Sequence, residues 1–443
     1  MAAHITVNNM ADGSRQLEDA LNVYNNTFNT DIKMLKTLQI ETILNIESRD
    51  VIATLPTGYG KSLTYEILPL LWKLKHNINT LIIVIVPLNV VMDQQTSKLG
   101  TSAIGLTKAL ATCCNKEFVE NLKTGNYQYM FSHPENILNN ANLNKLLIEN
   151  NQRKVIVVDE VHCMLDWGHD FRPDFKRIVN LRSVLPSARV LALSATLSTK
   201  AQQDVAKLLL MKSLHIVQCS PARDNISLIV CKRPSSKQNI TVKDTYDYAL
   251  KPMFQQLKVM KDEYPLTIIY FGGNINWVGH AYEVATFILK DDICDEFGSA
   301  RVVMYHSAME GSTNTLKEKV HASLKDSKSV LKIILATVAL GMGVDLRNVR
   351  QIINIGPPNT IEAYVQQIGR AGRDGEPSAA ILYYNGSDLA HVTNTMKEYC
   401  KGEECRRKTI IQYFMPNSQE SESGLPSICC DKFILKKNCC TNH

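Results

Sequence analysis

The feature that most constrains the fold is a series of short, mainly apolar runs in which β-branched residues are frequent. In the first half of the chain these runs lie at 50–55, 80–87, 127–132, 154–160 and 189–196. They do not alternate with polar residues, as expected of parallel strands that are buried on both faces. Helical patterns separate them, at 61–74, 90–99 and 198–211. The alternation of buried strand and helix predicts a doubly wound α/β domain with a parallel sheet.

The same alternation returns in the second half, after a polar stretch at 219–247. Further strands are expected at 266–271, 301–306, 331–337, 350–356 and 378–384. We therefore predict an α/β fold of two tandem doubly wound parallel-sheet domains, followed by a small helical, cysteine-rich C-terminal unit. The predicted parts are a loosely ordered segment at 1–27, a first domain at 28–218, a second domain at 219–385 and the C-terminal unit at 386–443.

Length and charge set broad limits on the class of protein. The 443 residues suffice for two or three domains, each with its own core. The net charge of +6 is compatible with a polyanionic partner, although an ordinary, slightly basic protein has the same charge. No run of 18 apolar residues occurs, and the N-terminal residues lack the basic and apolar regions of a signal peptide. We therefore expect a soluble intracellular protein without a membrane partner.

A turn with two glycines follows the first apolar run. Its residues are Thr57, Gly58, Tyr59, Gly60, Lys61 and Ser62. Main-chain N–H groups on such a turn, at the start of a helix, can surround a phosphate. Lys61 would neutralise the β- and γ-phosphates of a nucleotide, and Ser62 would bind Mg²⁺. The strict phosphate-loop pattern has a glycine at the position of Leu55, so a simple turn is the alternative.

Two carboxylates, Asp159 and Glu160, end the fourth run, directly after its apolar residues. Acidic side chains at the end of a buried strand are costly unless they meet a cation or a polar ligand. Asp159 would hold Mg²⁺ through water, and Glu160 would orient or activate the attacking water. A capped strand end with solvated acids is the alternative. After the fifth run, the small hydroxyl residues of 194–196 could form hydrogen bonds between neighbouring loops.

The second half contains "QQIGRAGRDGE" at 366–376, in which Arg370 and Arg373 stand three residues apart among glycines. Arginines presented in this way can reach a γ-phosphate that the other domain binds, and such residues contribute large rate factors to phosphoryl transfer. The alternative is a surface turn with solvated charges. The pattern favours a catalytic role for both arginines.

Two stretches suggest contacts with nucleic acid. The first, at 162–175, carries aromatic and basic side chains, namely Trp167, His169, Phe171, Arg172 and Phe175. Such side chains on a loop beside a nucleotide site suit stacking on unpaired bases, although a hydrophobic lid packed on its own domain is the alternative. The second stretch, at 336–350, has Thr337 and glycines at a strand end, where N–H groups could bind phosphates.

Cysteines concentrate at the C-terminus. Six of the twelve follow position 399, namely Cys400, Cys405, Cys429, Cys430, Cys439 and Cys440. Because no signal peptide directs the chain to an oxidising compartment, this cluster indicates metal binding before disulfides.

These motifs, in this order, resemble those of the RecQ family of superfamily 2 helicases. The segments that carry the likeness are "LKTLQIETI", "LPTGYGKSLTYEI", "VVDEVHCMLDWGHDFRPDF", "LSAT", "ATVALGMGVDLRNVR" and "YVQQIGRAGRDGE". The likeness covers roughly residues 28–433 and is most family-specific in the aromatic loop and in "QIGRAGRDG". It implies two tandem RecA-like domains and the activity of an ATP-dependent 3′→5′ DNA helicase.

The resemblance also implies roles for individual residues. Gln39 matches the glutamine that reads adenine, and Lys36 stands where the family usually has arginine. His162 completes a "DEVH" box that starts at Asp159, and Arg373 is our choice for the arginine finger.

The C-terminal unit resembles the family's zinc-binding segment. Cys405, Cys429 and Cys430 match zinc ligands there, but Phe433 occupies the position of the last cysteine. Cys439, Cys440 or His443 would have to substitute for that ligand. Otherwise the zinc site is incomplete, and the thiols are free on a frayed tail.

The resemblance implies ATP, Mg²⁺ and zinc as cofactors, and single-stranded and duplex DNA as partners. It implies a place in the nucleus and in DNA repair, recombination or replication. The winged-helix domain of longer relatives is not expected in this chain, which affects duplex separation more than ATP hydrolysis. Two alternatives stay open, an RNA helicase and an ATP-gated clamp on nucleic acid that does not unwind it.

Overall fold

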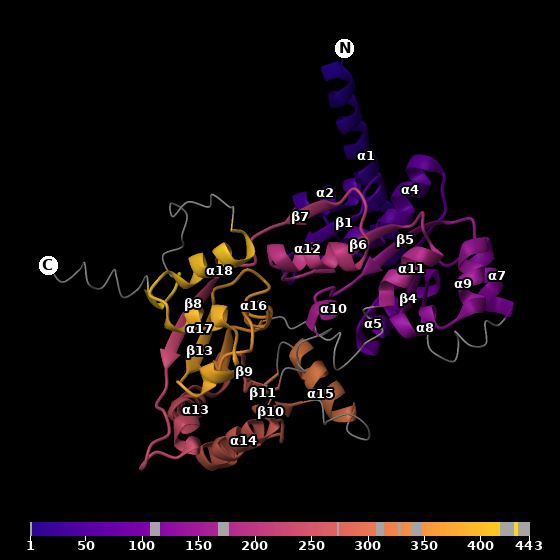
Figure 1. The fold of residues 1–443 in the computed structure, drawn as a ribbon. Coiled ribbons are helices and arrows are strands. Elements are labelled where there is room, and N and C mark those ends of the chain that lie inside the picture. Colours follow the sequence, from indigo (N-terminus) through magenta and orange to yellow (C-terminus); the bar gives the residue numbers. More distant parts are fainter. Residues whose placement is uncertain are drawn as a thin grey trace. The chain divides into compact units, whose positions relative to one another are not determined.

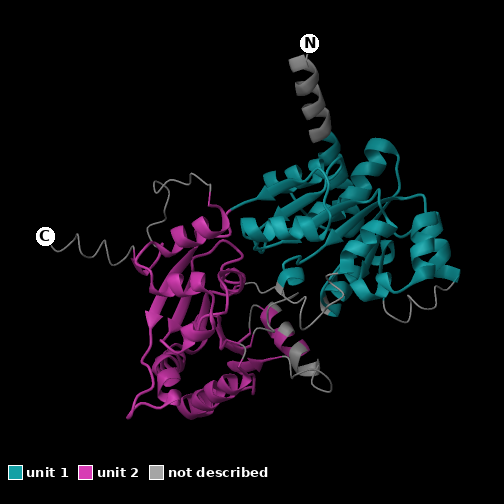
Figure 2. Cartoon of the chain, in the orientation of Figure 1, with its two compact units in different colours: residues 1–219 teal, residues 220–443 magenta. Residues whose placement is uncertain are grey.

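The structure is a computed structural model that describes residues 2–106, 116–166, 177–272, 274–306, 314–326, 329–337, 348–416 and 429–432. The chain divides into two compact units, residues 1–219 and 220–443 (Figure 2). The boundary lies one residue beyond the predicted one. None of the described helices is long and apolar enough to cross a membrane.

The described residues of unit 1 form a seven-stranded sheet in which every neighbouring pair is parallel (Figure 1). The strand order is β3-β4-β2-β5-β6-β1-β7. The strands are β1 (Val51–Thr54), β2 (Thr80–Ile85), β3 (Ala103–Leu106), β4 (Tyr129–Ser132), β5 (Arg153–Val158), β6 (Arg189–Ser194) and β7 (His215–Gln218).

Helices cover both faces of this sheet. Alternate residues of each strand point to opposite faces, so one strand contributes to two hydrophobic clusters. Ile82 and Val84 of β2 belong to one hydrophobic cluster, whereas Ile83 and Ile85 belong to another. The first cluster is completed by α1 (Ala2–Phe28), α2 (Thr37–Asn45), α3 (Leu63–Glu66), α4 (Leu68–His76) and α5 (Asn89–Leu99). The second is completed by α7 (Lys116–Thr124), α8 (Pro134–Leu138), α9 (Ala141–Glu149), α10 (Cys163–Asp166), α11 (Val179–Val184) and α12 (Thr199–Leu208).

Helix α1 differs from the prediction of a loosely ordered segment at 1–27. Leu17, Leu21 and Tyr24 are at most 5% exposed and join the core beside α4. Their spacing places them on one stripe of the helix, and burial of that stripe stabilises it. The sequence interpretation missed this helix because polar residues surround the stripe.

Unit 2 has a six-stranded sheet, again with every neighbouring pair parallel in the described residues, in the order β10-β11-β9-β12-β13-β8. Its strands are β8 (Ile226–Lys232), β9 (Thr267–Tyr270), β10 (Val302–Tyr305), β11 (Ile333–Ala336), β12 (Gln351–Ile355) and β13 (Ser378–Tyr384). One face packs on α13 (Val242–Met260) and α14 (Ile275–Leu289). The other packs on α15 (Asn314–Lys325), α16 (Ile361–Ile368), α17 (Asn394–Lys401) and α18 (Arg406–Phe414).

All ten strands expected from apolar runs are present, and the described residues contain three further strands that were not expected. These three, β3, β7 and β8, lie at the edges of their sheets. Burial decreases along β8 from Ile226 to an exposed Lys232. An edge strand is less enclosed than a central one, so its sequence need not be wholly apolar.

The described residues of the C-terminal cysteine-rich segment include α17 and α18, and they pack into the core of unit 2. Phe414 of α18 and Cys430 are buried in the same cluster as Leu228 of β8. The Leu228 N–H donates to the Cys429 carbonyl over 3.1 Å, so residues 429–430 cover the outer edge of β8.

Candidate active site

The phosphate turn, defined here as residues 55–62, begins where β1 ends, beside β6. The Leu55 N–H donates to the Ser194 carbonyl over 3.0 Å, which holds the start of the turn to the sheet. Gly58 and Gly60 have φ of 81° and 88°, a region that favours glycine. Lys61 Nζ donates to the Leu55 carbonyl over 3.4 Å, so the ammonium group lies at the mouth of the turn. The turn thus combines two glycines of positive φ with an ammonium group at the carboxyl end of β1.

Gln39 of α2 holds the same turn from the other side. Its Nε2 donates to the main-chain oxygens of Tyr59 and Gly60, over 3.0 Å each, and its Oε1 accepts from the Lys36 N–H over 2.8 Å. The Lys36 ammonium lies 4.7 Å from the centre of the Tyr59 ring. Gln39 and Lys36 therefore contact the residues predicted to surround the phosphates.

The carboxylates Asp159 and Glu160 follow β5, two strands from β1 in the sheet. The Asp159 N–H donates to the Ile85 carbonyl over 3.0 Å, and the Asp159 carboxylate accepts from the Glu160 N–H over 2.9 Å. Glu160 has a φ of 49°, a strained conformation that tends to occur at functional sites. Parallel strands end at one edge, so the acids and the turn share it.

The charges at this edge are incompletely balanced. Burial raises the pKa of Asp159, the neighbouring Glu160 raises it further, and Lys61 opposes the rise. A carboxyl group whose charged form is disfavoured in this way gains from a nearby cation. The donor set therefore suits Mg²⁺ at Asp159.

His162 connects the acidic pair to the strand beside it. Its Nδ1 lies 3.1 Å from Ser194 Oγ and 3.4 Å from Glu160 Oε2. Ser194 Oγ also accepts from the Thr196 N–H over 3.2 Å. The residues of 194–196 thus form hydrogen bonds between neighbouring loops, as predicted.

Glu66 is a buried acid that the sequence interpretation did not single out. It lies on α3, four residues after Ser62, and is fully buried. Its carboxylate accepts from Tyr24 OH over 2.5 Å and from Lys98 Nζ over 2.6 Å, and its main-chain carbonyl accepts from Tyr129 OH. Glutamate in the otherwise apolar "LTYEIL" was the available signal, because a buried charge requires partners.

The arginine loop, defined here as residues 369–376, follows α16 in unit 2. Arg370 is only 4% exposed, and Arg373 is partly exposed. Both lie near Tyr270 at the end of β9. Burial raises the pKa of Tyr270, and the positive charges of the two arginines counteract that rise. Arg350 binds Asp374 of the same loop over 2.6 Å.

Comparisons with known proteins match both units of the chain to helicases. The DEAD/DEAH box helicase family matches residues 36–205, and the helicase conserved C-terminal domain matches residues 257–375. The ATP-dependent DNA helicase RecQ of Haemophilus influenzae is 28% identical over 86% of this chain. The ATP-dependent DNA helicase Q1 of mouse is 29% identical over 92%.

The chain therefore resembles the RecQ family of helicases over most of its length.

The chain spans 59% of the Haemophilus RecQ protein and 62% of the mouse one. Among solved structures, the helicase MrfA bound to DNA has a TM-score of 0.62 at 17% identity, covering 84% of this chain and 51% of that one. The helicase Mss116 bound to single-stranded RNA has a TM-score of 0.60 at 18% identity, covering 84% and 73%. At these identities the structural likeness shows the fold, two tandem RecA-like domains.

Most of the predicted nucleic-acid contacts of this chain lie outside the described residues. They are Trp167, His169, Phe171, Arg172 and Phe175. Thr337 is described and buried at the end of β11, where its N–H donates to the Tyr305 carbonyl over 3.2 Å. That N–H is therefore already bonded within the protein.

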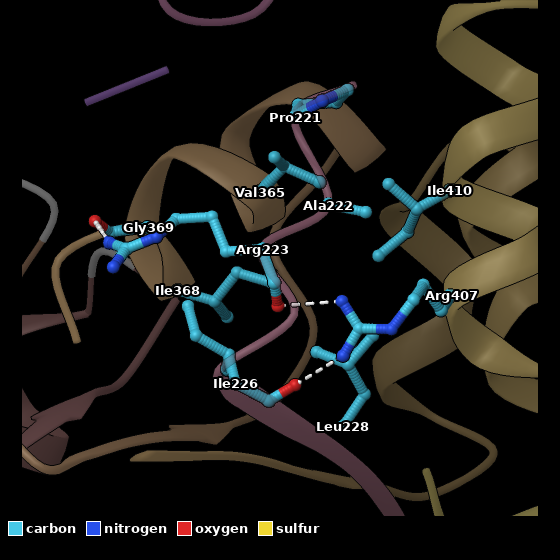
Figure 3. Close-up of a pocket in the computed structure, with 10 residues that line it drawn as sticks. All are labelled: Pro221, Ala222, Arg223, Ile226, Leu228, Val365, Ile368, Gly369, Arg407 and Ile410. Carbon is cyan, nitrogen blue, oxygen red and sulfur yellow. Dashed lines mark hydrogen bonds between the residues drawn. The ribbon is translucent and has the colours of Figure 1, made fainter. Parts of the chain in front are cut away.

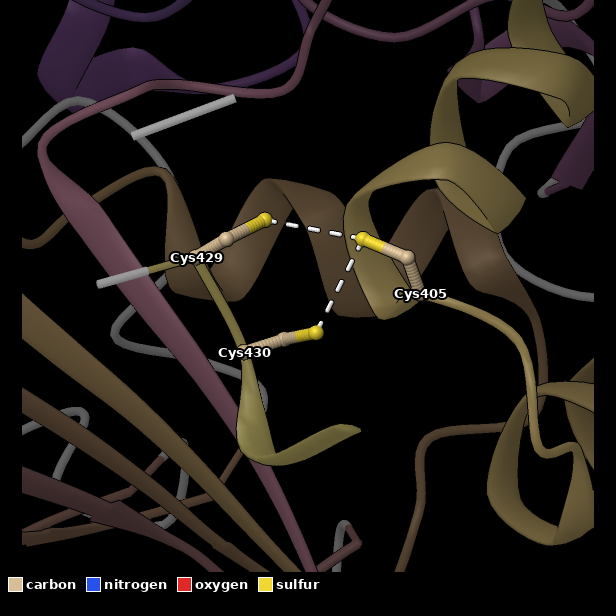
Figure 4. A group of neighbouring side chains, drawn as sticks. All are labelled: Cys405, Cys429 and Cys430. Carbon is tan, nitrogen blue, oxygen red and sulfur yellow. Dashed lines mark hydrogen bonds between the residues drawn. The ribbon is translucent and has the colours of Figure 1, made fainter. Parts of the chain in front are cut away.

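Three of the cysteines predicted as RecQ-type zinc ligands lie together (Figure 4). Cys405 Sγ is 3.5 Å from Cys429 Sγ and 3.7 Å from Cys430 Sγ, and all three sulfurs lie within 4.8 Å of one another. Tetrahedral zinc with Zn–S bonds of about 2.3 Å places its sulfurs roughly 3.8 Å apart. The three thiols fit such a site. Phe433 and the proposed substitute ligands Cys439, Cys440 and His443 lie outside the described residues.

Proposed function

We propose that this chain is an ATP-driven DNA helicase that moves 3′→5′ along single-stranded DNA and separates duplex DNA. The observation that carries the proposal is the single edge of the unit 1 sheet where Lys61, Asp159 and Glu160 meet. The phosphate turn follows β1 and the acidic pair follows β5, two strands away at the same edge of the sheet, an arrangement that suits ATP hydrolysis.

In this proposal Lys61 neutralises the β- and γ-phosphates, and the N–H groups of residues 57–62 surround them. Ser62 and Asp159 would hold Mg²⁺, which would supply charge neutralisation to the phosphates. Glu160 orients the attacking water and accepts its proton. The contact of His162 with Glu160 and Ser194 supports a fixed orientation of that carboxylate.

The nucleotide base is the proposed ligand of Gln39 and Lys36. In the structure both hydrogens of the Gln39 amide are donated to the phosphate turn. Binding of adenine through that amide would exchange one of these bonds. A rearrangement of the turn on nucleotide binding is therefore part of the proposal.

Arg370 and Arg373 are assigned to the γ-phosphate, with Arg373 as the finger. The ion pair between Arg350 and Asp374 of the arginine loop supports this role, because a guanidinium stabilises a transition state only when it is held in place.

DNA is the proposed polymer, and its use in repair, recombination or replication would place the protein in a cell nucleus. The relatives named as DNA helicases support this choice. Trp167, Phe171 and Arg172 are the proposed stacking residues. Zinc is the proposed ligand of the three-cysteine cluster, where it would join α18 to the segment at 429–430.

The test is ATP hydrolysis by the purified protein without polymer, with single-stranded DNA and with RNA, alongside Lys61→Ala. Strong stimulation by DNA that the variant loses is expected. Stimulation by RNA alone would identify an RNA motor instead. Hydrolysis absent in all three, from a folded protein that binds DNA, would indicate a clamp.

Unwinding is tested separately on duplexes with a 3′ or a 5′ single-stranded tail. Displacement of the strand only from the 3′-tailed duplex is expected. Displacement from the 5′-tailed duplex would contradict the proposed direction, and DNA-stimulated hydrolysis without displacement would limit the protein to translocation.

A further inference from the structure

The arginine loop is held mainly by side chains from the start of unit 2. Arg223 NH1 donates to the main-chain oxygens of Gly369 and Ala371, over 3.3 and 3.0 Å, and Arg223 NH2 donates to that of Gly372. One guanidinium thus binds three main-chain carbonyls, that of the residue before Arg370 and those of the two residues after it. The plane of the guanidinium fixes the directions of all these bonds at once.

Asn225 adds a second attachment from the same segment. Its Nδ2 donates to the carbonyls of Gly372 and Glu376, over 2.9 and 2.8 Å, and its main-chain oxygen accepts from the Ser378 N–H over 2.8 Å. A methyl group on Gly372 would lie 2.4 Å from Asn225 Nδ2 and 2.7 Å from the Glu376 oxygen. The loop is therefore closely packed against this side chain.

The segment that carries Arg223 is itself held by Arg407 of α18 (Figure 3). Arg407 NH1 donates to the Arg223 carbonyl over 2.6 Å, and its NH2 donates to the Ile226 carbonyl over 2.7 Å. Arg407 is 1% exposed, so water competes little for these bonds. Around them Arg223, Arg407 and Gly369 line a cavity of about 10 Å³, which leaves room for about one water molecule.

Arg407 also contacts the three-cysteine cluster. Its Nε donates to Cys429 Sγ over 3.3 Å, and Cys429 in turn lies beside Cys405. A continuous path of hydrogen bonds therefore runs from the cluster through Arg407 to Arg223, and from Arg223 to the arginine loop. Every residue of this path belongs to unit 2.

We propose that Arg223 and Arg407 are positioning residues through which the cysteine cluster sets the geometry of the arginine loop. Arg407 fixes the segment 223–226 against Cys429, and Arg223 fixes the main chain on both sides of Arg370. The functional consequence rests on the proposed role of Arg370 and Arg373 in ATP hydrolysis. Neither positioning residue contacts the nucleotide in this proposal.

The kinetic test uses Arg223→Lys, which keeps the charge but loses the planar fork. With saturating DNA, we expect kcat for ATP to fall about tenfold or more, with KM changed less than twofold, because displacing a catalytic group by about 1 Å costs up to about 100-fold. The double variant Arg223→Lys/Arg373→Ala should hydrolyse ATP no more slowly than Arg373→Ala alone. A normal kcat for Arg223→Lys, or effects of the two substitutions that multiply, would overturn the proposal.

Arg301→Lys is the matched control. Arg301 is a buried arginine of unit 2 that donates to two main-chain carbonyls, those of Asp292 and Cys294, far from the arginine loop in the sequence. Its substitution should leave kcat within about twofold of the wild type. A fall in kcat equal to that of Arg223→Lys would mean that any lost buried arginine has this effect, and would overturn the specific role.

A second measurement does not depend on hydrolysis. Amide hydrogen exchange at Gly372 and Gly375, whose N–H groups donate to Val349 and Gly372, should become at least tenfold faster in Arg407→Lys and in Cys429→Ser. Unchanged exchange in both variants would refute the coupling. Accelerated exchange in a protein that hydrolyses no ATP would uphold the coupling and refute the proposed function.

Discussion

The phosphate turn of unit 1 and the arginine loop of unit 2 are both glycine-containing loops, but they are anchored differently. The amide of Gln39, which is 20 to 21 residues away in the sequence, donates two hydrogen bonds to the turn. Arg223 and Asn225, roughly 150 residues away, donate five bonds to main-chain oxygens of the arginine loop. A loop that must admit a ligand keeps few bonds that it can exchange, whereas a loop that must present a side chain is held firmly.

The largest effect should come from the chemistry itself. Glu160→Gln keeps the size of the side chain and the strained main chain but removes the base, so kcat should fall by about 10²–10⁴-fold. ATP binding, measured with a fluorescent nucleotide, should change little. Residual hydrolysis above a tenth of the wild-type rate would show that Glu160 is not the base.

Glu66→Ala should be the most destabilising change beside the phosphate turn. It removes the buried carboxylate that accepts from Tyr24 OH and from the exposed Lys98 Nζ, and a buried hydroxyl left without its acceptor costs about 1–3 kcal/mol. The measurement is the free energy of unfolding in urea. The control is Lys145→Ala in the exposed pair Lys145–Glu149, which should cost less than about 1 kcal/mol. Similar costs for the two variants would mean that α1 and α5 do not hold the turn through Glu66.

Glycine substitutions compare the two loops directly. A methyl group on Gly60 would lie 2.7 Å from Gln39 Nε2, a side-chain atom, whereas one on Gly372 would meet the Glu376 main-chain oxygen at 2.7 Å. Gly60→Ala should therefore raise KM for ATP, and Gly372→Ala should lower both kcat and the melting temperature.

Gly375→Ala separates strain from contact in that comparison. Gly375 has a φ of 89°, but a methyl group there would meet nothing within 4 Å. It should cost only the conformational strain, about 1 kcal/mol. An equal loss for Gly372→Ala and Gly375→Ala would contradict the close packing against Asn225.

The smallest effect concerns the outer side of the arginine loop. The hydrogen bond from Arg350 lowers the pKa of Asp374, so the folded state binds a proton less readily than the unfolded state. The stability that this pair contributes is present above the ordinary pKa of aspartate, and it is lost as the pH falls through the lowered pKa. The difference in melting temperature between wild type and Asp374→Asn should therefore be small at neutral pH and vanish in acid. A difference in melting temperature that grows as the pH falls would contradict the lowered pKa of Asp374.

The central strands, and the placement of the proposed site residues at their ends, could be predicted from the sequence, because both depend on local pattern. A strand buried on both faces is apolar throughout, so β1, β2 and β5 are recognisable one at a time. The carboxyl ends of parallel strands share one edge, so Lys61 and Asp159 could be paired without coordinates. Helix α1 could not be recognised with equal ease, because its buried stripe is narrow and its stability comes from packing on α4.

The sequence by itself determined the fold class, the resemblance to RecQ helicases and the residues proposed for the nucleotide site. Only the tertiary structure decided which distant side chains hold the two loops, Glu66 for one and Arg223 with Arg407 for the other. An arginine that binds main-chain carbonyls cannot be recognised in the sequence, since every residue offers a carbonyl. The packing of the chain decides which carbonyls it reaches, as for Arg407, which lies between β8 and Cys429.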